Sequence, residues 1–166
     1  MIKMEVKNCL EAIGGNLLSG DKNKVFRGVS IDSRTLIENE LFICICGDRF
    51  NGHDFIKEAQ NKKASAIVLS DSSRIALKNN MAPPVIHVDD TLKALQELAR
   101  FHRSQMSVKV IGVTGTNGKS TTKEMTASII EKKFKTIKTK GNLNNHIGLP
   151  LNLFRLSKKD EVAVME

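Results

Sequence analysis

The 166-residue sequence contains no tryptophan or tyrosine, only three cysteines and three prolines, and no long apolar run. A membrane-spanning helix needs roughly 20 consecutive apolar residues, so no transmembrane segment is predicted. The first residues include Lys3, Glu5 and Lys7 and lack the apolar core of a signal peptide. We therefore expect a cytoplasmic protein that has no membrane partner.

The few cysteines and histidines argue against disulfides and zinc. Cys9, Cys44 and Cys46 form no CxxC pair, so we interpret all three as small buried hydrophobes. The histidines at positions 53, 87, 102 and 146 lack metal-ligand spacing. His53 and His146 fall in predicted loops, so both remain candidates for a functional role.

Acidic residues are fewer than basic ones, and the formal net charge is +8. Basic patches can bind nucleic acid, but the lysines are spread along the chain and no Trp or Tyr is present to stack on bases. We therefore expect a general preference for anions and no nucleic-acid partner.

Residues 108–122 have the order of a phosphate-binding loop. Apolar residues predict a buried strand, and glycines at 112, 115 and 118 allow the following backbone to turn its N–H groups inward. Lys119 would place a charge on the phosphates, and Ser120 would offer its hydroxyl to Mg²⁺ where a helix begins. The alternative is a glycine-rich strand-to-helix turn, because position 113 is valine where a strict P-loop has glycine. The helix is predicted to carry Met125, Ile129 and Ile130 on one face.

Before this loop, apolar periodicity predicts a helix over 6–13 that ends at Gly14, and strands over 24–31, 41–46 and 66–69. Helices are expected near 55–59 and 75–77. Pro83 and Pro84 interrupt the pattern, so we predict domains at 1–84 and 85–166. A strand over 85–88 and a helix over 92–103, capped by Asp90, lead to the phosphate loop.

After the loop helix, the sequence predicts a strand over 136–139, an amide-rich loop over 141–150, a helix from Pro150 and a strand over 162–165. This alternation predicts an α/β fold, with a small N-terminal α/β domain followed by the first part of a P-loop domain with a parallel sheet. The phosphate loop, the amide-rich loop and Glu166 should meet at the carboxyl edge of the sheet. Residues 162–165 are expected to form an unpaired edge strand.

The segments VIGVTGTNGKSTTKE (110–124), TKGNLNNHIGLPL (139–151) and DEVAVME (160–166) resemble the Mur ligases. SIDSR (30–34) and ELFICICGDRFNGHDF (40–55) extend the resemblance toward the N-terminus. The GNLNNHIGLP segment favours the type that adds D-alanyl-D-alanine to UDP-N-acetylmuramoyl-tripeptide. This resemblance implies an ATP-dependent amide-bond ligase of peptidoglycan synthesis that acts through an acyl phosphate.

The resemblance also implies roles for individual residues. Lys119 would act in catalysis, and Ser120 with Glu166 would hold Mg²⁺. The ATP phosphates would be bound by Gly115, Thr116, Asn117, Gly118, Lys119, Ser120 and Thr121. The uridine-diphosphate end of the substrate would contact Ile31, Ser33, Asp48, Arg49 and Phe50, and its sugar-phosphate side Asn142, Asn144 and Asn145.

Members of this family are longer than 166 residues, so the chain is expected to be an N-terminal fragment of a monomeric ligase and to catalyse no ligation alone. Two alternatives stay open. The chain could belong to a diaminopimelate- or lysine-adding ligase of the same family, or it could be a nucleotide-binding module without catalysis.

Overall fold

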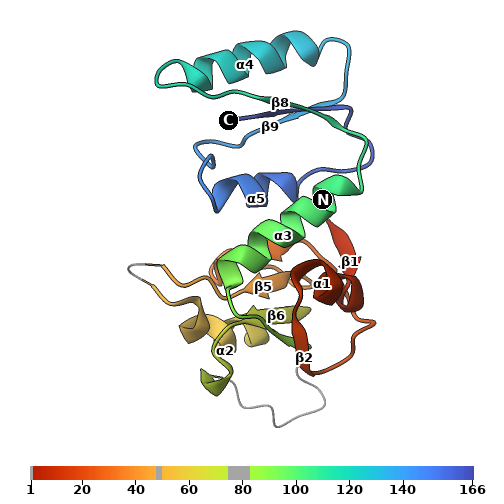
Figure 1. Ribbon diagram of the computed structural model, residues 1–166, viewed down its shortest axis with the longest axis vertical. Coiled ribbons are helices and arrows are strands. Elements are labelled where there is room, and N and C mark those ends of the chain that lie inside the picture. Colours follow the sequence, from red (N-terminus) through yellow and green to blue (C-terminus); the bar gives the residue numbers. More distant parts are fainter. Residues whose placement is uncertain (1, 48–49, 75–82) are drawn as a thin grey trace. The chain divides into compact units, whose positions relative to one another are not determined.

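The computed structural model describes residues 2–47, 50–74 and 83–166. Its helices and strands divide between two compact units, residues 1–98 and residues 99–166 (Figure 1). Each unit contains a sheet with parallel strands, which confirms the predicted α/β fold. Among the helices in the described ranges, none is long and apolar enough to cross a bilayer.

The first unit is built on a five-stranded sheet with the order β2-β7-β6-β5-β4. These strands are β2 (Asn16–Ser19), β4 (Val29–Ser30), β5 (Leu41–Ile43), β6 (Ala66–Leu69) and β7 (Val85–His87). Strands β4 to β7 are parallel, and β2 pairs antiparallel with β7. Every residue of β5 and β6 is buried, as expected for apolar strands covered on both faces.

Short helices and a second strand pair complete this unit. The pair is β1 (Lys3–Glu5) with β3 (Val25–Arg27), and the helical elements are α1 (Val6–Ile13), η1 (Gly52–Phe55), α2 (Ile56–Asn61) and η2 (Ser72–Arg74). Helix α1 ends as predicted at Gly14, whose φ of 63° suits glycine. One core cluster joins α2 to the sheet, through Leu36, Phe42, Cys44, Ile56, Ala59, Ala64, Ile67, Leu69 and Val85.

The division between the units falls later than residue 84, where the sequence predicted it. Strand β7 begins directly after Pro83-Pro84 and still pairs with β6 and β2 of the first sheet. Helix α3 (Thr91–Ser104) follows, and the two units divide within it, between residues 98 and 99. A proline pair interrupts hydrogen bonding but does not stop the next strand from joining the same sheet. The helix predicted over 75–77 lies outside the described residues.

The second unit has a three-stranded parallel sheet with the order β8-β10-β9. Its elements are β8 (Lys109–Gly112), α4 (Lys119–Ile130), β9 (Thr136–Lys138), α5 (Gly148–Leu153) and β10 (Val162–Met165). Helices α4 and α5 cover opposite faces of this sheet (Figure 1). The side chains of strand β10 point alternately toward the two helices. Val162 and Val164 pack with α4, whereas Ala163 and Met165 pack on the α5 side. The predicted parallel sheet is therefore confirmed.

Strand β10 lies in the centre of this sheet, so the prediction of an unpaired edge at 162–165 is wrong. The edge strands of this sheet, as far as the structure describes it, are β8 and β9, and all four residues of β8 are exposed. Val110 is 43% exposed and Ile111 is 36% exposed. The order of the strands in space differs from their order in the sequence because β10 inserts between β8 and β9.

The predicted apolar face of α4 is also wrong. Met125 and Ile129 are 61% and 67% exposed, whereas Lys123 and Ala127 are buried and Ile130 packs beside them. The spacing of 123, 127 and 130 follows one face of a helix, so the inward face contains a lysine where the sequence suggested an apolar residue.

The prediction of three buried cysteines holds for two of them. Cys9 and Cys44 are buried, and burial raises the pKa of each thiol to about 12. Cys46 is exposed because β5 ends at Ile43 and the chain then turns, and its thiol donates to Asn51 Oδ1 at 3.3 Å.

Candidate functional site

The loop between β8 and α4 has the geometry of an anion site. Gly118 lies directly before α4 with a φ of 76°, a conformation that glycine adopts without strain. The first N–H groups of α4 have no partner within the helix, and they point with the helix dipole toward this loop. Lys119 Nζ donates to the Gly115 carbonyl at 2.8 Å, so its charge lies over the loop. A phosphate group would find backbone donors and a cation there.

Three residues from three elements meet at the end of β10. Ser120 Oγ lies 3.0 and 3.2 Å from the two carboxylate oxygens of Glu166. Asn144 Nδ2 donates to Glu166 Oε1 at 3.0 Å. The Glu166 amide in turn donates to Thr139 Oγ1 at 2.9 Å, which fixes the backbone end of this side chain. The predicted meeting of the phosphate loop, the amide-rich loop and Glu166 is present in the second unit.

The surroundings of Glu166 act on its pKa in opposite directions. Burial raises the pKa of this carboxyl group, since the side chain is only 4% exposed. Hydrogen bonds from Ser120 and Asn144, with the charge of Lys123, lower the pKa further than burial raises it. The net pKa lies below the usual value for glutamate, so Glu166 is a carboxylate at neutral pH.

The oxygen atoms at this place suit magnesium. Mg²⁺ prefers hard oxygen ligands and usually binds through one or two carboxylates together with substrate phosphates and water. Ser120 and Glu166 supply a hydroxyl and a carboxylate beside the phosphate loop. In the ranges that the structure describes, no group of three or more His, Cys, Asp or Glu side chains could enclose a metal by itself. A metal here would therefore be shared with a phosphate ligand.

Asn142 and Asn145, the other asparagines of the loop that were predicted to bind the substrate, have different surroundings from Asn144. Asn145 Oδ1 accepts hydrogen bonds from Ile147 N at 3.1 Å and Gly148 N at 2.7 Å, so this side chain shapes its own loop. Asn142 is exposed on the same loop. Sequence reasoning missed Asn152, which is fully buried and donates to the Leu143 carbonyl at 2.9 Å. The sequence signal that could have identified Asn152 is a polar residue within the apolar pattern of α5.

Several residues that were predicted to bind the substrate line a cavity of about 400 Å³ in the first unit. Its lining consists of Ile31, Asp32, Ser33, Arg34, Ile45, Phe50, Gly52 and Phe55. Ile31, Ser33 and Phe50 were predicted, whereas Asp48 and Arg49 lie outside the described residues. The side chain of Phe50 is 72% exposed, so it is open to a ligand. The cavity is thus bordered by two aromatic rings and an ion pair.

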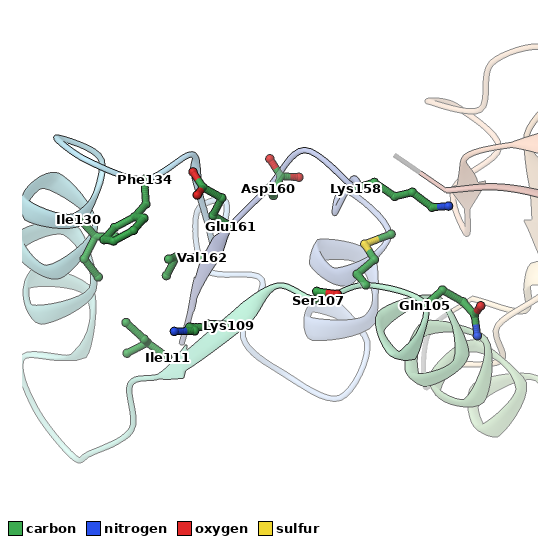
Figure 2. Close-up of a pocket in the computed structure, with 11 residues that line it drawn as sticks. Gln105, Ser107, Lys109, Ile111, Ile130, Phe134, Lys158, Asp160, Glu161 and Val162 are labelled. Atoms are coloured by element: carbon green, nitrogen blue, oxygen red, sulfur yellow. The ribbon is translucent and has the colours of Figure 1, made fainter.

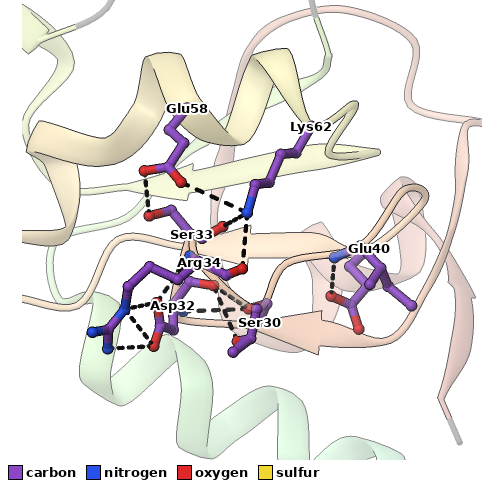
Figure 3. Close-up of polar contacts among 9 residues, drawn as sticks. Ser30, Asp32, Ser33, Arg34, Glu40, Glu58 and Lys62 are labelled. Carbon is purple, nitrogen blue, oxygen red and sulfur yellow. Dashed lines mark hydrogen bonds and ion pairs between the residues drawn. The ribbon is translucent and has the colours of Figure 1, made fainter.

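The polar residues behind this cavity form a network that Figure 3 shows. Ser33 Oγ donates to Glu58 Oε2 at 2.7 Å, so the hydroxyl of this buried serine faces α2. Lys62 Nζ donates to the carbonyls of Ser33 at 2.7 Å and Arg34 at 2.8 Å. These bonds fix the turn after β4. Because the Ser33 hydroxyl is already bonded to Glu58, Ser33 helps to shape the turn and does not offer a free hydroxyl to a ligand.

Asp32 and Arg34 were not singled out from the sequence as binding residues, although both lie within the SIDSR segment. The Arg34 guanidinium makes three hydrogen bonds to the Asp32 carboxylate, at 2.7, 2.9 and 3.2 Å, and holds the pKa of this carboxyl below its usual value. The side chain of Arg34 is 84% exposed. An exposed guanidinium in a planar pairing geometry is suited to phosphate as well as to carboxylate.

His53 proves to be a structural residue. It is 3% exposed, and its Nε2 accepts hydrogen bonds from the amides of Ser70 at 3.0 Å and Asp71 at 3.2 Å. Because Nε2 is an acceptor, the proton is assigned to Nδ1, which lies 2.7 Å from Asn51 Oδ1. Burial lowers the pKa of His53, and the nearby Asp71 carboxylate offsets this only in part.

A larger pocket of about 860 Å³ lies in the second unit. Figure 2 shows the side chains that line it. It lies beside the edge strand β8, with Ile111, Ile130 and Phe134 among its apolar side chains. Lys109, Asp160 and Glu161 mark the amino ends of β8 and β10 within the same hollow. Ligands of parallel sheets bind at the carboxyl ends of strands, so size alone does not make this hollow the functional site.

Two family models match separate parts of the chain. The model described as "Mur ligase family, catalytic domain" matches residues 25–103, and the model described as "Mur ligase middle domain" matches residues 113–166. The second match contains the phosphate loop, Asn144 and Glu166. The matches fall on either side of the end of α3, in agreement with the two units.

The chain is similar to curated proteins and to solved structures. The chain is 41% identical, over all of its length, to the UDP-N-acetylmuramoyl-tripeptide--D-alanyl-D-alanine ligase of Bacillus subtilis (strain 168), of which it covers 36%. It is similar to the crystal structure of MurF from Acinetobacter baumannii, with a TM-score of 0.88 and 29% identity, over 100% of this chain and 36% of that one.

A third comparison adds a bound ligand. The MurF ligase from Thermotoga maritima, solved in complex with ADP, is 34% identical with a TM-score of 0.74, over 84% of this chain and 31% of that one. The chain thus spans about a third of the length of the relatives it matches.

Proposed function

Because the chain belongs to the Mur ligase family, we propose that it carries the nucleotide-phosphate site of an ATP-dependent ligase that adds D-alanyl-D-alanine to UDP-N-acetylmuramoyl-tripeptide. The observation that supports this most is the convergence of Ser120, Asn144 and Glu166 beside the phosphate loop. The 41% identity to the Bacillus subtilis ligase favours the dipeptide-adding type. Such an enzyme acts in the cytoplasm during peptidoglycan precursor synthesis, and we expect it to be a monomer without nucleic-acid or membrane partners.

In the proposed reaction, the terminal carboxylate of the tripeptide takes the γ-phosphoryl group of ATP and becomes an acyl phosphate. The amine of D-alanyl-D-alanine then displaces phosphate and forms the amide bond. Negative charge moves between phosphate and carboxylate oxygens in both steps. Backbone donors of residues 115–121 and the ammonium of Lys119 would stabilise that charge, because they are oriented before the reaction begins.

Ser120 and Glu166 are the residues that we propose to hold magnesium. Their hydroxyl and carboxylate oxygens are the hard donors that this ion requires. Bound there, Mg²⁺ would neutralise part of the charge on the phosphate oxygens. The ADP complex of the Thermotoga maritima relative supports nucleotide binding by this family.

For the first unit we propose that the cavity beside Phe50 receives the uridine-diphosphate end of the substrate. Phe50 and Phe55 offer rings on which a base could stack, and Arg34 offers a cation for the diphosphate. Ile31 and Ser33 would shape the wall, with Asp48 and Arg49 contributing from the adjoining segment. We further propose that Asn142, Asn144 and Asn145 line the path of the sugar-phosphate side.

The nucleotide site can be tested with the chain itself. Lys119→Ala should weaken ADP binding in the presence of Mg²⁺ by about 10- to 100-fold in calorimetry, because a charged hydrogen bond contributes roughly 1.5–3 kcal/mol. Circular dichroism should be unchanged, since Lys119 is a loop-facing side chain. Lys132 is an exposed lysine in the turn after α4, and Lys132→Ala is the matched control, which should bind ADP normally.

Ligation needs a second experiment. In a chimera, residues 1–166 replace the matching third of the Bacillus subtilis relative, and the products of ATP, Mg²⁺, UDP-N-acetylmuramoyl-tripeptide and D-alanyl-D-alanine are identified by mass. We expect the pentapeptide product, and about 10²-fold slower turnover when Lys119 is alanine. A folded chimera that binds ADP yet forms no pentapeptide would contradict the proposed reaction.

A further inference from the structure

Helix α4 buries a lysine against the sheet. The side chain of Lys123 is 3% exposed and lies on the inward face of the helix with Ala127. A buried ammonium costs a large desolvation free energy unless charged partners compensate for it. The two partners of Lys123 are the carboxylates of Glu124, at 3.4 Å, and Glu166, at 3.5 Å.

These two ion pairs differ in their surroundings. Glu124 is 52% exposed and also pairs with Lys138 at 2.6 Å, so water screens that side of the network. Glu166 is only 4% exposed. Water therefore screens the Lys123–Glu166 pair far less, and Glu166 is the partner on which the charge of Lys123 acts most strongly.

The donors around Glu166 divide between its two oxygens. Asn144 binds Oε1, Lys123 lies nearest to Oε2, and Ser120 contacts both. Ser120 and Lys123 are three residues apart on α4, so they project from the same face of the helix. Of these three donors Lys123 alone carries a full charge, and its side chain is buried.

We propose that Lys123 is a positioning residue, which holds the Glu166 carboxylate in its place at the phosphate loop before a magnesium–nucleotide complex binds. This inference rests on the proposed nucleotide site and extends it to a residue that does not itself touch the ligand. A carboxylate ordered in advance loses little conformational entropy on binding, so it binds the metal more tightly. Without Lys123, the buried carboxylate loses this ion-pair partner and turns toward water.

The test compares ADP affinity with Mg²⁺ and with EDTA, by calorimetry on the whole chain. In the unmodified chain, Mg²⁺ should tighten ADP binding. Lys123→Met should reduce this magnesium-dependent gain by about tenfold or more, the usual effect of removing a residue that orients a metal ligand. Its affinity for ADP in EDTA should stay within about twofold, because Lys119 and the loop amides are unchanged.

Two further variants separate positioning from packing. Lys123→Arg keeps the charge and should recover most of the magnesium-dependent gain. Lys138→Met removes the lysine that pairs with the exposed Glu124 carboxylate, and it should behave like the unmodified chain. An unchanged gain in a folded Lys123→Met protein, or an equal loss in Lys138→Met, would overturn the proposal.

Two further outcomes, a variant that fails to fold and a chain that binds no ADP, also test the proposal. If Lys123→Met fails to fold, the double variant Lys123→Met/Glu166→Gln should fold, because it removes the buried carboxylate together with its partner. A double variant that stays unfolded would show that Lys123 serves only the packing of α4, which contradicts the proposal. If the unmodified chain binds no ADP under either condition, the nucleotide site itself is wrong. If the unmodified chain binds ADP but the magnesium-dependent gain is unchanged in Lys123→Met, only the proposed role of Lys123 is contradicted.

Discussion

His53 joins two distant segments of the first unit through one imidazole ring. Its Nε2 accepts the amides of Ser70 and Asp71, and its Nδ1 contacts Asn51. The ring can do this only when it is neutral, since a protonated imidazole has no acceptor atom. Burial lowers the pKa of His53 from the ordinary value of 6.5, and the same cause lowers the pKa of His102.

The direction of the pH effect follows from this lowered pKa. As pH falls, the unfolded chain binds a proton near pH 6.5 and the folded chain binds it only at lower pH, so the unfolded state is favoured. The free energy of unfolding should therefore fall from pH 7 toward pH 5. His53→Gln should make this fall less steep, and a part should remain because His102 contributes with the same sign. Urea unfolding at several pH values measures how the free energy of unfolding depends on pH.

His87→Gln is the matched control for this prediction. His87 lies on β7 and is partly exposed. Its replacement shows how the loss of a histidine that does not belong to the His53 contacts affects the same measurement. If His53→Gln retained the full slope, the lowered pKa of His53 would not be the source of the acid sensitivity.

At the scale of residues, some contacts could be predicted and others could not. The meeting of Ser120 and Glu166 follows from the order of elements, because the carboxyl ends of neighbouring parallel strands share one edge. Lys123 could not be recognised, since most helical lysines are solvated and its partner lies on a distant strand. The orientation of the Ser33 hydroxyl toward Glu58 likewise depends on packing that no local pattern contains.

Strand β8 is an edge strand with exposed apolar side chains. It pairs with β10 on one side, and within the described ranges no strand pairs with its other side. Val110 lines a hollow with Leu149 and Leu153, and Ile111 lines the one in Figure 2. Unpaired edges with apolar neighbours promote association between chains.

We therefore predict that the chain self-associates in a concentration-dependent way and that Val110→Lys reduces this association. A charged residue on an edge strand disfavours pairing with a second strand, and Val110 is exposed enough to accept the change. Sedimentation velocity over a range of concentrations measures it. Ile37→Lys places the same charge on another exposed apolar residue, 60% exposed and far from β8 in the sequence. Equal effects of both variants would show that net charge, not the β8 edge, controls association.

At the scale of elements, segments with a clear apolar pattern were predictable, and segments without one were not. Strands β6 and β10 and helix α3 follow clear apolar patterns and lie within a residue or two of the predicted positions. Strands β1 and β2 have three and four residues, and their sequences show too little alternation to be recognised. Their pairing depends on β3 and β7, which supply the missing hydrogen bonds from elsewhere in the chain.

In the part of the chain that the structure describes, each of the two units contains core clusters of its own. The cluster around Phe42 and Ile67 lies wholly in the first unit, and the clusters around β10 lie in the second. The sequence indicated two domains but misplaced their boundary, because Pro83-Pro84 is a strong local signal and the pairing of β7 is a long-range one. A shared helix, α3, joins the units without a loop between them.

Separate cores predict separate responses to ligands. ADP with Mg²⁺ should slow amide hydrogen exchange over residues 112–123 and 139–148 and leave the cavity segments 30–36 and 50–56 unchanged. UDP-N-acetylmuramoyl-tripeptide should slow exchange mainly in those cavity segments. At a ligand concentration about 100 times Kd, mass action contributes roughly 2.7 kcal/mol, so amides that open through unfolding of the liganded unit should exchange about 100-fold more slowly. Exchange followed by mass spectrometry resolves these peptides.

Variants assign each response to its site. Lys119→Ala should lose the ADP response and keep the response to the UDP-linked substrate. Arg34→Ala should show the reverse, because Arg34 borders the first-unit cavity and the phosphate loop belongs to the second unit. Protection of both units by ADP with Mg²⁺ alone would contradict this division of binding. A first unit that responds to neither ligand would mean that the cavity beside Phe50 is not the substrate site, while the assignment of the phosphate loop would stand on the ADP response of the second unit.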